Sequence, residues 1–148
     1  ESGRHPFVTC VGREDEPCLP RRASFACDAH YAGEALPVLP VEFRPTSGSP
    51  GVVLDRIIAD TGADSTALPW DDCRTLSLSQ GRPAQMAGVT GGVVTAMIFR
   101  VWVFLDGEEY PCRLIAHFGG THRILGRDVL NRLEVLFRGP AGEVVLNP

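Results

Sequence analysis

The stretch that decides the fold runs from Ile57 to Thr66 and reads IIADTGADST. Its first three residues close an apolar run that begins at Val52, and such a run is typical of a buried strand. The acid that follows, Asp60, precedes a small hydroxyl residue and a glycine, which places it on a tight turn at the strand end. A carboxyl in this apolar setting favours a raised pKa or a proton shared with a second acid. The tripeptide Asp-Thr-Gly alone is weak support, because it occurs by chance in roughly a few per cent of chains of this length.

The apolar runs around this stretch predict an all-β fold. From Leu36 onward, short runs rich in Val, Ile, Leu and Phe are separated by Gly and Pro at intervals of roughly ten residues, as in all-β proteins. Asp106-Gly107 separates two of these runs and predicts a tight hairpin, because both residues tolerate a positive φ. Helical periodicity is confined to Arg127–Leu133. The expected strands are Val38–Phe43, Val52–Ala59, Gln85–Val89, Val93–Leu105, Tyr110–Ala116 and Val144–Leu146.

Two further motifs follow the Asp-Thr-Gly. A glycine-rich segment occupies Met86–Gly92, and the sequence ILGRD occupies Ile124–Asp128. In this order and spacing the three motifs resemble the retropepsins, the single-domain aspartic proteases of retroviruses and their cellular and bacterial relatives. The resemblance extends from Leu36 to Pro148. It implies an all-β, closed acid-protease barrel with one short helix near the C-terminus.

The resemblance also implies roles for the first motif. Under it, Asp60 is the catalytic aspartate, Thr61 locks two active-site loops together through its hydroxyl, and Gly62 lets the substrate backbone approach closely. The glycine-rich segment matches the flap, a mobile hairpin that closes over a bound peptide. The residues implied to bind substrate are Ala63, Asp64, Gly88, Val89, Thr90, Gly91 and Ile124.

The third motif is expected to support the first. Gly126 belongs to the segment that passes beneath the catalytic loop in the family. Arg127 is the expected partner of Asp64, because a guanidinium can bind a carboxylate through two parallel hydrogen bonds. The last strand, Glu143–Pro148, matches the part of the family that contributes to a sheet between subunits.

The mechanism follows from the number of catalytic acids. The chain has one Asp-Thr-Gly, and the chemistry needs two carboxyl groups. Two like charges about 3 Å apart cannot both ionise, so one proton is shared between them. We therefore expect a homodimer with Asp60 of each copy facing its mate across a twofold axis. The expected activity is that of an aspartic endopeptidase, which hydrolyses extended peptides with no metal or other cofactor.

Two alternatives keep the same fold. In one, the chain is a catalytically silent, dimeric peptide-binding or scaffolding module. In the other, residues 1–35 mask the site until they are removed. A cysteine or serine hydrolase is disfavoured, because the four histidines are scattered and lack a recognisable nucleophile partner.

The amino-acid composition limits the classes of binding partner that we expect. Of the 148 residues, 44% are hydrophobic and 22% are charged, which is typical of a globular protein with a real core. The 14 basic residues are scattered against 18 acidic ones, so nucleic acid is not an expected partner. No apolar run approaches the roughly 20 residues that span a bilayer, and no signal peptide is evident, so we expect no membrane partner and a cytoplasmic location.

The domain prediction divides the chain into residues 1–35, an irregular leader, and residues 36–148, the protease-like domain. Propeptide, extra strand, linker and flexible tail are all compatible with the leader. The leader also holds Cys10, Cys18, Cys27 and His30, which could bind zinc or include a disulfide. Free thiols or one disulfide are favoured over zinc, because only Cys27 and His30 are closely spaced, and the odd count of five cysteines argues against a fully paired framework.

Overall fold

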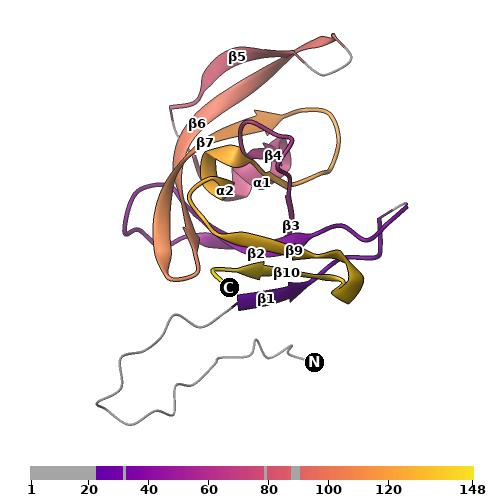
Figure 1. The fold of residues 1–148 in the computed structure, drawn as a ribbon. Helices are drawn as coiled ribbons and strands as arrows, with labels where there is room; N and C mark the ends of the chain where they lie inside the picture. Colours follow the sequence, from indigo (N-terminus) through magenta and orange to yellow (C-terminus); the bar gives the residue numbers. More distant parts are fainter. Residues whose placement is uncertain (1–22, 32, 79, 88–90) are drawn as a thin grey trace, which may run out of the picture.

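The computed structural model describes residues 23–31, 33–78, 80–87 and 91–148. Within them the regular secondary structure is mainly β-strand, with only short helices (Figure 1). The strands are β1 (Ala23–Ala26), β2 (Val38–Arg44), β3 (Val52–Ala59), β4 (Ala67–Pro69), β5 (Arg82–Ala87), β6 (Val93–Leu105), β7 (Glu108–His117), β8 (Ile124–Leu125), β9 (Val135–Arg138) and β10 (Glu143–Leu146). The helices are α1 (Trp70–Thr75), α2 (Arg127–Leu130) and a 3₁₀ turn at Gly139–Ala141.

Six strands close into a barrel. The hydrogen-bonded order is β2-β3-β8-β4-β7-β6, and β6 pairs back to β2 through Phe43 and Val103. β5 continues the sheet beyond β6, and the two form the long hairpin that projects from the barrel in Figure 1. The expectation of a closed all-β barrel with a retropepsin-like arrangement is confirmed.

The alternation of residue types in each strand builds the barrel interior. In β2, Leu39, Val41 and Phe43 are buried, while the residues between them are more exposed. This period of two is what a strand with one face in a core requires. The same alternation runs through β6, where Val101, Val103 and Leu105 are buried. These side chains belong to one continuous core.

The hairpin between β6 and β7 has the turn that its sequence predicts. Asp106 has φ 52° and Gly107 has φ 85°, and the flanking pair is Leu105 with Glu108. Two consecutive positive φ values match the twist of the strands on either side.

A second sheet lies against the barrel and consists of β1, β10 and β9 in that order (Figure 1). The central strand, β10, has Val144 and Leu146 fully buried in the core, and Phe25 of β1 packs beside them. Because β10 is paired on both sides within its own chain, the last strand has no free edge to offer a second subunit. The edges of this sheet are β1 and β9.

The structure adds elements that the sequence pattern did not show. α1 is a second short helix, and α2 ends at Leu130 instead of Leu133. Residues 23–26 of the predicted leader form β1, and Asp28 pairs with Leu36 through two backbone hydrogen bonds of 2.8 and 3.0 Å. The domain boundary at residue 35 stays a prediction. Among the described residues, none of the helices has the length and apolar character needed to cross a membrane.

Candidate active site

Asp60 follows directly after β3, and neighbouring backbone fixes its position from two sides. Its N–H donates to the carbonyl oxygen of Leu125 in β8 at 3.1 Å. One residue earlier, the N–H of Ala59 donates to the carbonyl oxygen of Pro37 at 2.9 Å. The strand end is therefore held between the first residues of β2 and the parallel strand β8.

The turn after Asp60 orients its carboxyl group. The N–H of Gly62 donates to Asp60 Oδ1 at 2.8 Å, and the N–H of Ala63 donates to the Asp60 carbonyl oxygen at 3.3 Å. The carboxyl is half-buried, and its second oxygen, Oδ2, accepts no hydrogen bond from the described part of the chain. Thr61 is exposed beside it. One oxygen is thus held by the protein, and the other is open to a ligand, water or second carboxyl.

A buried hydrogen-bond network fixes the far end of the same loop. Thr66 is the one fully buried polar residue among those described. Its N–H and hydroxyl both donate to Asp128 Oδ1, at 3.0 and 2.9 Å, and its hydroxyl oxygen accepts from the N–H of Gly126 at 3.1 Å. Sequence reasoning missed Thr66 and Asp128, because the two residues meet only when β4 and α2 come together.

Gly126 is required by close packing. A Cβ at this position would lie 2.4 Å from the carbonyl carbon of Ser65 and 2.6 Å from its oxygen, both backbone atoms. The next residue, Arg127, donates its N–H to the carbonyl oxygen of Ala63 at 2.9 Å. The segment from β8 into α2 therefore passes directly against the loop after Asp60. The supporting role expected for Gly126 and Arg127 stays a prediction.

The predicted ion pair between Asp64 and Arg127 is present. Its side chains are 83% and 46% exposed, so the pair lies at the surface, and water competes for both charges. The predicted role of Asp64 in binding substrate is compatible with this exposure and stays a prediction.

Two further predicted substrate residues, Ile124 and Gly91, lie in the part of the chain that the structure describes. Ile124 of β8 is half-buried and pairs with Ile58, two residues before Asp60. Gly91, between β5 and β6, has φ 82°, a conformation that glycine adopts without strain. The predicted flap residues Gly88, Val89 and Thr90 lie outside the described residues.

Two of the described cysteines are unsuited to nucleophilic chemistry. Burial raises the pKa of Cys73 to about 12, and it raises the pKa of Cys112 well above the usual thiol range. Both remain thiols at neutral pH, whereas a cysteine nucleophile must be a thiolate. The zinc or disulfide alternative involves Cys10 and Cys18, which lie outside the described residues.

The geometry therefore defines an all-β barrel with a retropepsin-like fold and an Asp-Thr-Gly turn at the end of a barrel strand. Among solved structures, the chain is similar to the EIAV protease complexed with the inhibitor HBY-793. The match has 27% sequence identity and a TM-score of 0.51, and it covers 70% of this chain and 93% of that chain. No family model and no curated protein matches the chain.

Proposed function

We propose that this chain is an aspartic endopeptidase that acts as a homodimer. The observation that supports this most strongly is the state of the Asp60 carboxyl: one oxygen is held by a backbone N–H and the other has no partner among the described residues. The same barrel occurs in a retroviral protease at 27% identity. A single carboxyl cannot act as acid and base at once, so a second copy supplies the other Asp60.

In the proposed reaction, the two Asp60 groups share one proton and bind a water molecule between them. The ionised carboxyl accepts a proton from the water, and the oxygen of that water attacks the scissile carbonyl carbon. The protonated carboxyl gives its proton to the carbonyl oxygen, which produces a tetrahedral diol. Breakage of the C–N bond, with proton transfer to nitrogen, then releases an amine and a carboxylic acid.

The proposed substrate is a peptide in extended conformation. Half-buried Ile124 and its neighbour Ile58 supply an apolar floor beside Asp60, and Val93 and Val94 at the start of β6 are 63% and 58% exposed on the projecting hairpin. A peptide between these surfaces would present alternate side chains to each, as an added strand does.

The test compares the wild-type chain with Asp60→Asn on a mixed peptide library across a range of pH. We expect kcat/KM to fall by about 10²–10⁴-fold, the usual contribution of general acid–base catalysis. Asp71→Asn is the matched control, because the Asp71 side chain on α1 is 92% exposed. We expect this variant to have the kcat/KM of the wild-type chain. Undiminished cleavage by Asp60→Asn would refute the assignment. Binding of peptides without cleavage by the wild-type chain would favour the silent module.

Mixing the two chains tests the dimer. If each active site needs two intact Asp60 residues, a tenfold excess of the Asp60→Asn chain should capture most wild-type subunits and lower activity about tenfold. An equal mass of serum albumin should have no such effect. Activity that is unaffected by the excess variant would contradict a shared site.

A further inference from the structure

A cleft of 540 Å³ lies beside the catalytic strand, between the segment after β1 and strands β2 and β3. Its lining includes Asp28 and His30 from the first side and Val38 and Arg56 from the second. We call it the leader cleft. None of its residues has a role in the reaction proposed above.

The leader cleft opens on the face of β3 that carries Asp60. Val38 pairs with Ile58, and paired residues in neighbouring strands point to the same side of a sheet. Ile58 and Asp60 are alternate residues along one strand direction, so their side chains also share that side. Ile58 is flanked on its other side by Ile124. The row Val38, Ile58 and Ile124 thus connects the cleft to the catalytic carboxyl.

The position of Arg56 is set by a local irregularity in β3. The pairing of β2 with β3 shifts register between Leu39 and Val41, which leaves Pro40 opposite two β3 residues, and Arg56 has φ 58°. A left-handed conformation is unfavourable for a non-glycine residue, so surrounding contacts must hold it. Two contacts do so: Arg56 Nε donates to Asp28 Oδ2, and the guanidinium lies over the ring of Tyr31, 5.3 Å from its centroid.

The negative charge of the cluster is turned inward. The side chain of Asp28 is 8% exposed, and it accepts hydrogen bonds from the N–H and Nδ1 of His30, both at 2.8 Å, besides that from Arg56. The His30 N–H and these side-chain donors hold the pKa of Asp28 below its usual value. Arg56 and His30 are 53% and 88% exposed. The donor groups of Arg56 and His30 are therefore more accessible to solvent or a ligand than the accepting carboxylate of Asp28.

Arg56 retains the donors that suit a carboxylate. Within the described residues only its Nε makes a hydrogen bond, so the two Nη groups are unused. The ring of Tyr31 covers the face of the guanidinium and leaves these in-plane donors accessible. Tyr31 is itself held edge to face by His122, at 5.6 Å between ring centroids. A stacked guanidinium with a free fork is a recurrent carboxylate-binding arrangement.

We propose that the leader cleft binds the carboxylate of an acidic substrate residue three or four positions from the scissile bond. This inference rests on the proposed endopeptidase function. The spacing follows from strand geometry, because Arg56 of β3 precedes Asp60, just beyond the strand end, by four residues, and an extended peptide rises by a similar ~3.3 Å per residue. The cleft would add a charge requirement to a site whose floor is otherwise apolar.

The test uses fluorescein-labelled peptides that carry Glu or Gln at each position on both sides of an apolar pair. Cleavage is measured with the wild-type chain and binding with Asp60→Asn, so that the charge preference can be read even where no peptide is cut. We expect Glu to be favoured over Gln by about tenfold three or four residues from the pair, at equivalent positions on its two sides because the dimer carries two such clefts, and this is the gain typical of a charge-assisted hydrogen bond. In Arg56→Gln the Glu-to-Gln ratio should fall to about one.

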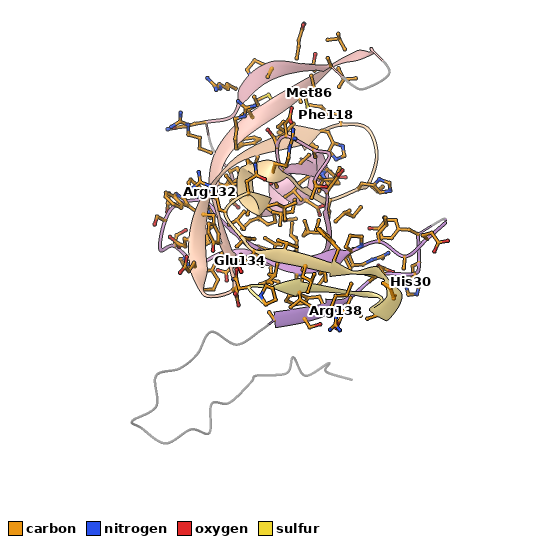
Figure 2. All side chains as sticks on the ribbon, in the orientation of Figure 1. His30, Met86, Phe118, Arg132, Glu134 and Arg138 are labelled. Carbon is orange, nitrogen blue, oxygen red and sulfur yellow. The ribbon has the colours of Figure 1, made fainter. Side chains whose placement is uncertain are left out.

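Two further variants separate charge recognition from folding. Arg56→Lys keeps the ion pair with Asp28 but loses the fork, so we expect an intermediate ratio. Arg132→Gln is the matched control: Arg132 is exposed and lies on the opposite side of the molecule from His30 (Figure 2). The Glu-to-Gln ratio of Arg132→Gln should equal that of the wild-type chain. Thermal melts check that each variant folds.

The outcomes distinguish this inference from the function on which it rests. Peptide binding or cleavage with equal affinity for Glu and Gln at every position would overturn the leader cleft as a carboxylate site and leave the endopeptidase proposal intact. A preference that survives Arg56→Gln would also overturn it. Absence of both binding and cleavage would overturn the two proposals together.

Discussion

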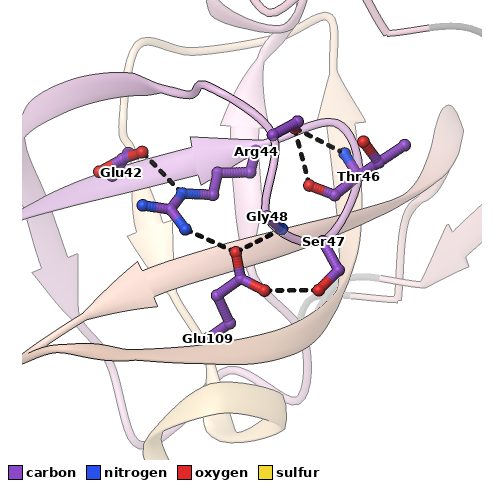
Figure 3. Close-up of polar contacts among 7 residues, drawn as sticks. Glu42, Arg44, Thr46, Ser47, Gly48 and Glu109 are labelled. Atoms are coloured by element: carbon purple, nitrogen blue, oxygen red, sulfur yellow. Dashed lines mark hydrogen bonds and ion pairs between the residues drawn. The ribbon is translucent and has the colours of Figure 1, made fainter.

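Two carboxylates in this molecule hold loops with nearly the same set of bonds but in different surroundings. Asp128 accepts from the N–H and hydroxyl of Thr66 at the far end of the loop that carries Asp60. Glu109 accepts from the N–H of Gly48 at 2.7 Å and the hydroxyl of Ser47 at 2.6 Å, and so fixes the loop between β2 and β3 (Figure 3). Each anchor thus uses one backbone donor and one hydroxyl donor.

The two sites differ in whether water can reach the hydrogen-bond donors once the carboxylate is removed. Thr66 is fully buried, so water cannot reach its donors if Asp128 is removed. Ser47 and Gly48 are exposed, and water can take the place of Glu109. Glu109 also has a charged partner, Arg44 Nη1 at 2.5 Å, whereas no ion pair to Asp128 is present in the described structure. Similar hydrogen bonds should therefore differ in their contribution to stability according to solvent access.

The largest expected effect is that of Asp128→Ala. It leaves two buried donors of Thr66 without an acceptor, and we expect the free energy of unfolding to fall by about 2–4 kcal/mol, since each unsatisfied buried group costs about 1–3 kcal/mol. Urea denaturation measures the loss. Asp128→Asn, which keeps the Oδ1 acceptor, should lose less. A loss in Asp128→Ala no greater than that in Glu109→Ala would break the comparison.

A smaller effect is expected from Gly126→Ala, which leaves the hydrogen bonds in place but forces backbone apart. The added Cβ would meet Ser65 backbone atoms at 2.4 and 2.6 Å. We expect a loss of about 1–3 kcal/mol, typical of overpacking, together with a fall in the kcat of the proposed reaction, because Ser65 belongs to the loop that carries Asp60. Gly139→Ala is the control, since nothing lies within 4 Å of a Cβ there. Equal free energies of unfolding of the two variants would show that the loop containing Ser65 can shift without loss of stability.

The smallest expected effect concerns Glu109 and depends on pH. The Ser47 hydroxyl, followed by the Arg44 guanidinium and the Gly48 N–H, lowers the pKa of Glu109 from 4.5 to about 2. Its folded pKa lies below its unfolded pKa, so its stabilising contribution is fully present above 4.5 and is lost as the pH falls through about 2. The urea midpoints of wild type and Glu109→Gln should therefore differ most near neutral pH and converge in acid. A difference that persists unchanged at pH 2 would mean that the charge is not responsible.

The long elements of the fold were predictable from the sequence, and the short ones were not. β6 and β7 carry enough alternating residues for their period to be seen, and Asp106-Gly107 marks the turn between them. β8 has two residues, so it is a strand only by virtue of pairing with β3 and β4. α1 could have been suspected from Pro69 and the acids Asp71 and Asp72, which are typical of a helix start.

In the candidate site, too, some features were predictable from the sequence and others were not. Asp60, Gly62 and the Asp64–Arg127 pair belong to contiguous motifs, which the sequence displays directly. The contact of Thr66 with Asp128 joins the same two segments, 57–66 and 124–128, but neither residue type marks it beforehand. His30 attracted notice as a metal ligand, but the structure pairs it with Asp28. Such contacts depend on how the strands close around the core, which periodicity does not specify.

The intrachain pairing of β10 on both sides has a consequence for how this protein would be controlled. A polypeptide that completes its own terminal sheet can finish folding before it meets a second copy, so maturation and assembly become separate steps. If catalysis belongs to the pair alone, activity at low abundance would rise with the square of the number of chains. Local crowding, by a shared tether or a common scaffold, would then suffice to start the proposed activity.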